Sequence, residues 1–381
     1  MLKHTLFTPG PTNVPPQVLA ALGRPIVHHR APDFEPIFQQ AREGLQYVFR
    51  TKNPVVPLTS SGTGGMEAAV TSLLGPGDKA LAIEGGKFGE RWGLICKAFG
   101  VDCHVEKIEW GAAASPELIG RLLKEHPGVK AVFTTHCETS TGALTDIEAI
   151  AKVVAPTDAA LVVDAVSSLG AEPLETDAWG IDVVVTGSQK ALMLPPGMAF
   201  VSVSPKAQAL IDSAKSANYY FSLKAALKKL AENTTPYTGP VSMIVALNAA
   251  IDLIRKEGLE NIWARHRRCA AAIRAGCGAI GLALFGQSPS NVVIPLTVPQ
   301  GVDAGKLVKT MRDSFGMTIT GGQEQLKGKI IRIAALGYVE EFEVLALIGA
   351  LEMALLRQNY ACGKGAGVAA AVTSLNESMR S

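Results

Sequence analysis

The chain has 381 residues, of which 48% are hydrophobic, and its 36 lysines and arginines nearly balance 34 acidic residues for a net charge of +2. This length is sufficient for two domains or for one large α/β domain with an appendage. The balanced charge gives no reason to expect binding to nucleic acid or to an anionic membrane, so we expect neither partner.

The N-terminal sequence MLKHTLFTPGPTNVPP has too short an apolar run for a signal peptide. No stretch approaches the roughly 18 uninterrupted apolar residues of a membrane span. The cysteines show neither a CxxC pattern nor a metal-ligand spacing, and the histidines form no HExxH motif. We therefore expect free thiols, no metal site and a cytoplasmic protein.

Residues 1–16 are proline-rich and irregular, which predicts an N-terminal arm that is ordered only where it docks on another part of the chain. From there to residue 203, short apolar runs alternate with helical patterns. The runs LVV at 161–163 and VVV at 183–185 are continuous rather than alternating, which is typical of strands buried on both faces. Strands separated by helices predict an α/β fold with a mostly parallel sheet between helices.

The pattern changes after residues 241–275, which predict helices with a break at Gly258. The segments NVVIPLTVP and GKIIRIAALG then predict strands, and AGKLVKTMRDSF and EEFEVLALIGALEMALLRQ predict helices. We therefore expect an arm over 1–16, a large domain over 17–258 and a smaller C-terminal α+β domain over 259–381. We interpret the basic cluster at 265–268 as a solvated helix face, and we expect the tail from residue 361 to be loosely held.

Candidate binding residues follow several predicted strands, and ligands of open parallel sheets bind outside the carboxyl ends of the strands. The segment SSGTGGMEA at 60–68 is a glycine-rich turn that leads into a helix, whose backbone N–H groups would hold a phosphate. It lacks the third glycine of the dinucleotide-binding motif and the Gly-Lys-Ser/Thr of a P-loop. On its own, the segment is also consistent with a simple strand–helix turn.

Three further strand ends each carry a residue with two interpretations. Phe88, in a glycine-flanked loop, is either a core residue or a stacking platform for a flat ligand. Thr139, in THCETSTG, either donates a hydrogen bond to an anion or caps the next turn. Asp164 is at the end of a predicted buried strand. Burial of a carboxylate is energetically unfavourable unless it contacts a cation or several hydrogen-bond donors. Asp164 is therefore either a structural residue, in a salt bridge or an N-cap, or a ligand-binding group.

Lys190 follows the VVV strand in the segment GIDVVVTGSQKALMLPPG. Its side chain either extends to the surface or is buried, and a buried amine tends to lose its proton and to become a nucleophile suited to a Schiff base with an aldehyde. Together, the signals at the strand ends require one ligand that is flat and carries a phosphate, an aldehyde and a basic ring nitrogen. Pyridoxal 5′-phosphate has all of these features.

On this hypothesis, Lys190 forms the Schiff base, and Asp164 keeps the pyridine nitrogen protonated so that the ring acts as an electron sink. Phe88 stacks on one face of the ring, and Val166 packs on the other. The phosphate is expected to bind Gly62, Thr63, Thr139 and Gln189, and Ser61 completes the predicted cofactor-binding set.

Several motifs along nearly the whole chain match one family: TPGPTNVPP, SGTGGMEAA, THCETSTG, VDAVSSLGAEPL, TPYTGPV and GKIIRIAALG. The chain resembles the class V aminotransferases of fold type I, specifically the alanine/serine–glyoxylate aminotransferase group. The resemblance implies a large domain with a mostly parallel, seven-stranded-type sheet and a homodimer with active sites at the interface. It also implies that Thr238 reaches the phosphate of the partner subunit, and that Arg332 holds the substrate α-carboxylate through two parallel hydrogen bonds.

The sequence departs from some members of the family at two positions. Phe88 stands where some relatives have a stacking tryptophan, and Thr235 replaces a tyrosine that helps to bind the phosphate. We expect these changes to alter the affinity for the cofactor and not its identity. Outside the family context, Arg332 would be interpreted as a charge at a strand edge, and the sequence assigns no role to His28, His29 or Arg30.

The resemblance implies ping-pong transfer of an amino group from a small amino acid to a 2-oxo acid such as glyoxylate or pyruvate. Alanine or serine is the favoured donor and aspartate a further candidate, because no second arginine for a distal carboxylate is evident. One alternative is a class V lyase similar to cysteine desulfurase, which needs a nucleophilic cysteine on a C-terminal loop, and the context of Cys362 does not match that loop. Another is a non-enzymatic interaction protein, which the presence of Lys190, Asp164 and Arg332 disfavours.

Overall fold

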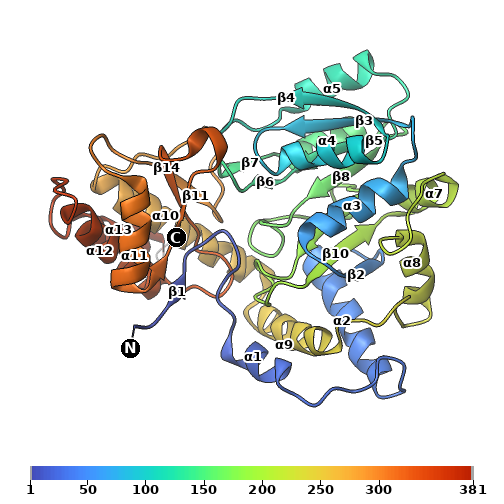
Figure 1. Ribbon diagram of the computed structural model, residues 1–381, viewed down its shortest axis with the longest axis horizontal. Coiled ribbons are helices and arrows are strands. Elements are labelled where there is room, and N and C mark those ends of the chain that lie inside the picture. Colours follow the sequence, from blue (N-terminus) through green and yellow to red (C-terminus); the bar gives the residue numbers. More distant parts are fainter. Residues whose placement is uncertain (1, 379–381) are drawn as a thin grey trace.

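In the computed structural model, which describes residues 2–378, the chain forms two lobes that lie side by side along the longest axis (Figure 1). The larger lobe contains a seven-stranded sheet, and the smaller lobe contains the C-terminal helices and strands together with the N-terminal strand. Among the described residues, no helix is both long and apolar enough to cross a membrane.

The central sheet is mostly parallel, as the sequence predicts. Across the sheet, the strands are β2 (Val55–Thr59), β10 (Met198–Val203), β9 (Val183–Gly187), β8 (Ala160–Asp164), β5 (Ala131–Thr135), β3 (Lys79–Glu84) and β4 (Asp102–Lys107). Strand β10 is antiparallel to both neighbours, whereas the other pairs are parallel. Every residue of β5, β8 and β9 is buried, which explains their continuous apolar sequences.

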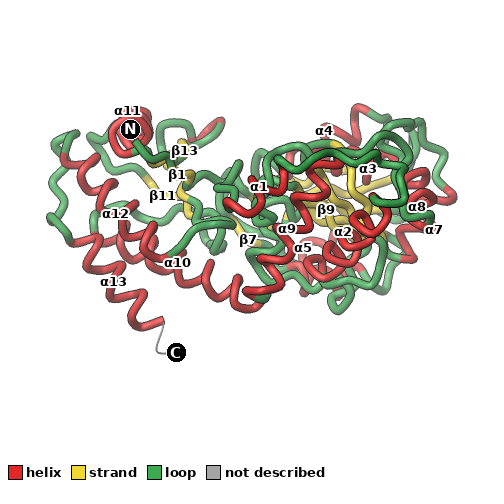
Figure 2. The backbone as a smooth tube through the Cα atoms, turned by 90° about the horizontal axis from the view of Figure 1, so that it is seen from below, coloured by secondary structure: helices red, strands yellow, loops and turns green. Residues whose placement is uncertain are grey.

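Helices cover both faces of this sheet, and Figure 2 shows the strands enclosed between them. Helix α3 (Gly62–Leu73) packs against β9 and β10, and α4 (Gly89–Ala98) packs against β3 and β4. The other helices of this lobe are α1 (Pro16–Leu22), α2 (Phe34–Phe49), α5 (Pro116–Glu125), α6 (Ile147–Val154), α7 (Pro205–Ser213), α8 (Leu223–Ala231) and α9 (Val241–Glu257). Because α3 and α4 follow β2 and β3 directly, both helices begin at the carboxyl edge of the sheet.

Gly258 separates α9 from α10 (Leu259–Ala279), as the sequence predicts, and its φ of 84° favours glycine. Helix α10 leads into the smaller lobe, where a second sheet has the order β11 (Ile294–Thr297), β14 (Ile330–Ile333), β13 (Thr320–Gly321). The remaining elements are the helices α11 (Ala304–Phe315), α12 (Glu341–Leu356) and α13 (Ala366–Ser378), the 3-10 helix η1 (Glu324–Leu326), and the short strand pairs β1 (Thr5–Leu6) with β12 (Met317–Thr318) and β6 (Cys137–Glu138) with β7 (Ala143–Leu144).

The buried hydrophobic residues form two large clusters. One extends from Val18 to Ile262, and the other contains residues from Cys269 to Leu375 together with Phe7 of the N-terminal arm. The arm therefore docks on the smaller lobe, where β1 pairs with β12. On this basis we propose that the boundary between the two domains lies at Gly258, with the first turn of α10 still packed on the larger core.

The expectation of a loosely held tail is wrong for the described part of it. Residues 366–378 form α13, which buries Ala371 and Leu375 and packs along α10. The buried Glu352 carboxylate accepts hydrogen bonds from the backbone N–H of Gly365 (3.1 Å) and Gly367 (2.6 Å) at the start of this helix. Gly367 lets the helix approach α10 closely, since a Cβ there would lie 2.8 Å from the Gly276 carbonyl. Residues 379–381 lie outside the described part of the chain.

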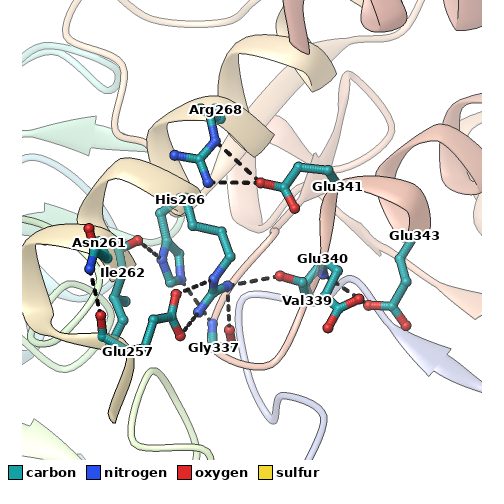
Figure 3. A network of polar contacts seen from close by, with 11 residues as sticks. Glu257, Asn261, Ile262, His266, Arg268, Gly337, Val339, Glu340, Glu341 and Glu343 are labelled. Carbon is teal, nitrogen blue, oxygen red and sulfur yellow. Dashed lines mark hydrogen bonds and ion pairs between the residues drawn. The ribbon is translucent and has the colours of Figure 1, made fainter. Parts of the chain in front are cut away.

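The interpretation of residues 265–268 as a solvated face is also wrong, since only Arg267 is exposed. The Nδ1 of buried His266 lies 2.7 Å from the carbonyl of Ile262, and its Nε2 accepts the N–H of Gly337 at 3.0 Å, as Figure 3 shows. Burial lowers the pKa of His266 to about 3, so the ring is neutral. Arg265 donates to the carbonyls of Gly337 and Val339, and these contacts fix the loop that follows β14.

Candidate active site

A cavity lies at the carboxyl edge of the central sheet, where β2, β3, β8 and β9 end. It brings together most of the predicted site residues and several that were not predicted. The lining residues are Gly10, Pro11, Ser61, Gly62, Thr63, Met66, Phe88, Arg91, Asp164, Val166, Gln189, Lys190 and Pro196. The predicted positions Thr139, Thr238 and Arg332 do not line it.

Lys190 is buried at the base of this cavity. Its Nζ donates to the carbonyl of Pro9 in the N-terminal arm and to the Ser167 hydroxyl at 3.1 Å. Burial lowers the pKa of Lys190 to about 8, although the nearby Asp164 opposes the shift. A sizeable fraction of the amine is therefore neutral, and hence nucleophilic, in mildly alkaline solution.

Asp164 is the last residue of β8 and is buried, and its Oδ1 accepts the N–H of Val166 at 2.8 Å. Burial raises the pKa of this carboxyl group to about 6, and the backbone hydrogen bond opposes the shift. At pH 7 the group is mostly ionised and has no ion-pair partner within 4.0 Å among the described residues. The cavity therefore contains a carboxylate whose ionisation a bound cationic group would favour.

The N-terminus of α3 forms another wall. The N–H groups of Gly62 and Thr63 have no backbone acceptor among the described residues, whereas the N–H of Gly64 is bonded to the Ser61 carbonyl at 2.9 Å. Ser61 at the N-cap makes no side-chain capping bond. A Cβ at Gly62 would lie 2.7 Å from Val166 Cγ2, so only glycine allows this close approach. The Gln189 amide oxygen is buried without a partner among the described residues, so this amide is available for a hydrogen bond in the cavity.

Arg91 is a cavity residue that the sequence analysis missed. Its Nη1 donates to Thr63 Oγ1 at 2.8 Å, and its guanidinium carbon lies 4.9 Å from the centre of the Phe88 ring. In the structure, Arg91 lies three residues after Phe88 at the start of α4 and therefore on the same face, but the sequence analysis predicted no helix that begins there. Gly10, Pro11 and Ser167 carried no comparable signal, since they reach Lys190 only through the tertiary fold.

Thr139 and Arg332 lie behind the cavity and are joined to each other. The Thr139 hydroxyl lies 2.6 Å from Ser167 Oγ, which also accepts the bond from Lys190. Arg332, on β14 of the smaller lobe, donates from Nη1 to the Thr139 carbonyl at 2.9 Å and from Nε to the Gly321 carbonyl at 3.0 Å. Its Nη2 has no hydrogen-bond partner in residues 2–378, so one end of the guanidinium is available.

The other candidates lie elsewhere. Thr238 is exposed and lines a separate hollow with Tyr220 and Tyr237. Arg30 is exposed, and its only side-chain hydrogen bond in the described chain goes to the carbonyl of Pro236. Cys362 packs against the core of the smaller lobe between α12 and α13 and does not line the cavity. Within residues 2–378, no three potential ligand side chains are grouped to hold a metal ion.

Comparison with known proteins identifies the family. The model of the class V aminotransferases matches residues 4–341. A Synechococcus protein described as the small subunit of a soluble hydrogenase is 42% identical over 97% of both chains. The L-aspartate–glyoxylate aminotransferase of Paracoccus denitrificans is 38% identical over 97% of this chain and 95% of its own.

The crystal structure of ureidoglycine–glyoxylate aminotransferase from Bacillus subtilis superposes with a TM-score of 0.95, at 32% identity and over 99% of both chains. Family model, relatives and solved structure thus agree over almost the entire length. The chain belongs to the class V aminotransferase family.

Proposed function

We propose that this aminotransferase transfers the amino group of a small amino acid to a 2-oxo acid, with glyoxylate as the first candidate acceptor. The observation that carries the proposal is that Lys190, a buried amine with a lowered pKa, lies in one cavity with the Asp164 carboxylate at the carboxyl edge of the sheet. A primary amine and a carboxylate at these positions are the two groups that amino transfer with pyridoxal phosphate requires.

Pyridoxal 5′-phosphate is the cofactor of class V aminotransferases, and the cavity residues fit it. The unpartnered amide of Gln189 and the free N–H groups at the start of α3 suit a phosphate, since a half-turn of the amide presents its NH₂ group. We propose that Ser61, Gly62, Thr63 and Gln189 hold the phosphate, that Phe88 and Val166 contact the two ring faces, and that Asp164 binds the ring nitrogen. The predicted phosphate role of Thr139 stays a prediction, because its hydroxyl contacts Ser167.

When bound, pyridoxal phosphate supplies an aldehyde that accepts an amino group and a cationic ring that withdraws electrons from the substrate α-carbon. We propose that Lys190 Nζ takes a proton from that carbon and would deliver it to the C4′ carbon of the cofactor, and that it moves a proton in the opposite direction when the 2-oxo acid binds, a role that its lowered pKa suits. Ser167 and the carbonyl of Pro9 hold the amine in place during this exchange. Asp164 maintains the ring charge, and the free Nη2 of Arg332 binds the substrate carboxylate.

The choice of glyoxylate rests on the relatives. The enzyme of Paracoccus denitrificans acts on L-aspartate and glyoxylate, and that of Bacillus subtilis acts on ureidoglycine and glyoxylate. The two differ in the donor and share the acceptor. Alanine and serine stay the favoured donors here, with aspartate included because Arg91 places a guanidinium in the cavity in addition to Arg332, which does not line it.

We further propose that the enzyme works as a homodimer in the cytoplasm. Thr238 is exposed and lies outside the cavity of its own chain, beside the aromatic side chains of Tyr220 and Tyr237, whose rings stack at 5.2 Å. An exposed aromatic hollow of this kind suits burial by a second subunit. In such a dimer, Thr238 would reach the phosphate site of the partner subunit, as the family resemblance implies.

The function is tested with purified protein, L-alanine, L-serine and L-aspartate as donors, and glyoxylate and pyruvate as acceptors. Lys190→Ala should abolish transfer and the visible absorbance of the bound cofactor. The control Lys206→Ala removes a lysine whose Nζ bonds the carbonyls of Thr157 and Ala159 near the amino end of β8, and it should retain activity. Normal transfer by Lys190→Ala would contradict the proposal, and release of sulfide from cysteine without an acceptor would instead indicate a lyase.

A further inference from the structure

We propose that Glu138 is a positioning residue of the active site, one that joins the loop carrying Phe88 to the segment that holds Arg332 and Ser167. The inference rests on the proposed function, because it assigns Glu138 the task of placing groups that contact cofactor and substrate. Glu138 itself does not line the cavity around Lys190.

Glu138 lies in β6 and is 5% exposed, and both of its carboxylate oxygens are occupied. Oε2 accepts the backbone N–H groups of Phe88 at 3.1 Å and Gly89 at 2.8 Å, which are the N-cap and the first residue of α4. Oε1 accepts the backbone N–H of Ser140 at 3.0 Å and its hydroxyl at 2.5 Å. The carboxylate thus connects the start of α4 to the turn that follows β6.

The surroundings of Glu138 are built for a carboxylate. It has no lysine, arginine or histidine within ion-pair distance among the described residues, so hydrogen-bond donors and not a direct ion pair meet the buried carboxylate. The N-terminus of α4 adds a favourable interaction with the helix dipole. A Cβ at Gly86 would lie 2.5 Å from Glu138 Cδ and 2.3 Å from Ser140 Oγ, so the loop before Phe88 approaches the carboxylate as only glycine allows.

The next residue along the chain extends the connection to the other functional groups. The Thr139 carbonyl accepts the Nη1 donor of Arg332, and the Thr139 hydroxyl contacts Ser167, which holds Lys190 Nζ. Residues 138–140 therefore link the ring platform, the carboxylate-binding arginine and the lysine. A shift of this turn would move all three relative to one another.

Glutamine cannot replace this carboxylate, although it has almost the same shape. The three backbone groups directed at the side chain are N–H donors that cannot rotate, and an amide offers one acceptor oxygen and one NH₂ group. In either amide orientation, the NH₂ group faces at least one fixed N–H, so one loop must move away. We expect the Phe88 loop or the Thr139 turn to shift, and hence poorer placement of Phe88 and Arg332.

The test compares Glu138→Gln with Glu352→Gln as a matched control. Glu352 is also a buried glutamate that accepts two backbone N–H groups at the start of a helix, but it lies in the smaller lobe away from the cavity. For each purified variant, we would measure thermal unfolding, the affinity of the cofactor-free protein for pyridoxal phosphate, the visible circular dichroism of the bound cofactor, and kcat and KM with L-alanine and glyoxylate.

Both variants should lose stability. Only Glu138→Gln should weaken cofactor binding, by about tenfold if roughly 1.4 kcal/mol of the energy of the lost loop hydrogen bond must be supplied again when the cofactor binds. It should also change the visible circular dichroism and raise the KM for L-alanine. Glu138→Gln that matches Glu352→Gln in these three readouts would overturn the inference. An inactive wild-type protein that binds no pyridoxal phosphate would instead overturn the proposed function.

A second variant keeps the inference testable if Glu138→Gln does not fold. Ser140→Ala retains the carboxylate and removes the hydroxyl that donates to Oε1 and accepts the N–H of Lys87 at 3.0 Å. It should change cofactor affinity, circular dichroism and KM in the same direction by a smaller factor. Ser140→Ala with unaltered values for all three would contradict the role of this turn.

Discussion

At the scale of single residues, the site holds a carboxylate and an amine that make no direct ion pair, and burial disfavours the charged form of each. Burial raises the pKa of Asp164 to about 6 and lowers that of Lys190 to about 8, and each charge partly opposes the shift of the other. The protein therefore keeps a carboxylate and an amine in a place where both ionised forms are costly. Such costs are typical of functional sites, where binding of the ligand compensates them.

The raised pKa of Asp164 predicts a pH-dependent gain in stability for Asp164→Asn in the cofactor-free protein. Between pH 3.8 and about 6, the folded state binds more protons at this carboxyl group than the unfolded state does. The contribution of Asp164 to the free energy of unfolding is therefore complete below pH 3.8 and is lost as the pH rises through 6. Asparagine avoids the buried charge. Relative to wild type, the variant should gain about 2–3 kcal/mol between pH 4 and pH 8, or less if the nearby charge of Lys190 becomes unopposed.

Urea unfolding of the two cofactor-free proteins across this pH range measures the difference. Asp158→Asn is the control, because Asp158 is exposed in the turn before β8 and should follow wild type at each pH. If the free energies of unfolding of wild type and Asp164→Asn changed in parallel with pH, ionisation of Asp164 would not destabilise the folded protein, and the prediction would be wrong.

At the scale of elements, the site depends on how closely α3 approaches the segment after β8. Gly62 has no positive φ, so its requirement is steric and not conformational. A methyl group there would lie 2.7 Å from Val166 Cγ2 and 3.2 Å from its Cγ1. Either α3 moves away or the Val166 side chain is pushed into the cavity.

Gly62→Ala should therefore weaken binding of pyridoxal phosphate by tenfold or more, if overpacking costs about 1–3 kcal/mol here. Adding Val166→Ala makes room for the new methyl group and should restore much of the affinity, which a loss of helix stability would not allow. Gly278→Ala is the control, because a Cβ at that helical glycine meets no atom within 4 Å. Cofactor titration of these proteins and of Val166→Ala alone, which lacks one proposed ring contact, tests the prediction. A double variant that binds much more weakly than Val166→Ala would contradict the steric account.

Sequence patterns predicted the strands that are buried on both faces. They missed the partly exposed strand at the edge of the sheet and the burial that depends on contacts between distant segments. The strands at 160–164 and 183–187 could be predicted because their apolar runs are continuous. Strand β4 has the sequence DCHVEK at the edge of the sheet, where partly exposed polar residues hide the strand signal. The helix at 366–378 and the buried side of 265–268 depend on contacts between α10, α13 and the loop at 337–341, which local periodicity does not contain.

For the site, the sequence identified the residues at the ends of strands. It did not predict the contacts made by the N-terminal arm or those between the two lobes. Asp164 and Lys190 follow apolar strands, so their location at the carboxyl edge could be predicted. The N-terminal arm could not be placed, although the carbonyl of Pro9 accepts the Lys190 amine and the Thr12 hydroxyl donates to the Lys190 carbonyl at 3.0 Å. The bond from Arg332 to Thr139 is equally non-local, since 193 residues separate the two.

At the scale of the whole molecule, the arm and the smaller lobe are both connected to the cavity. Phe7 lies in the core of the smaller lobe, while Pro9 and Thr12 contact Lys190 in the larger one. The N–H of Ala334, just after β14, donates to the carbonyl of Phe7 at 2.8 Å. The arm thus connects the strand of Arg332 to Lys190. The position of one lobe relative to the other therefore affects how Arg332 and Lys190 are placed.

The proposed dimer would connect Thr238 to the site of the partner subunit, and mixed dimers test this connection directly. We expect Thr238→Glu to weaken cofactor binding through repulsion of the phosphate, and Lys190→Ala to be inactive. If Thr238 acts on the partner subunit's site, a mixed dimer of these two variants has one site with both defects and one site with neither. Each mixed dimer should then have about half of wild-type activity and wild-type cofactor affinity at its intact site.

If Thr238 instead acted within its own chain, each site of the mixed dimer would carry one defect, and no wild-type site would form. Co-expression with two different affinity tags allows the mixed dimer to be purified, and its activity is measured against glyoxylate at limiting pyridoxal phosphate. Size-exclusion chromatography of each parent variant shows whether dimers form at all. Because Thr238 is exposed in the single chain and lies outside the cavity, recovered activity would mean that the second subunit completes the phosphate site.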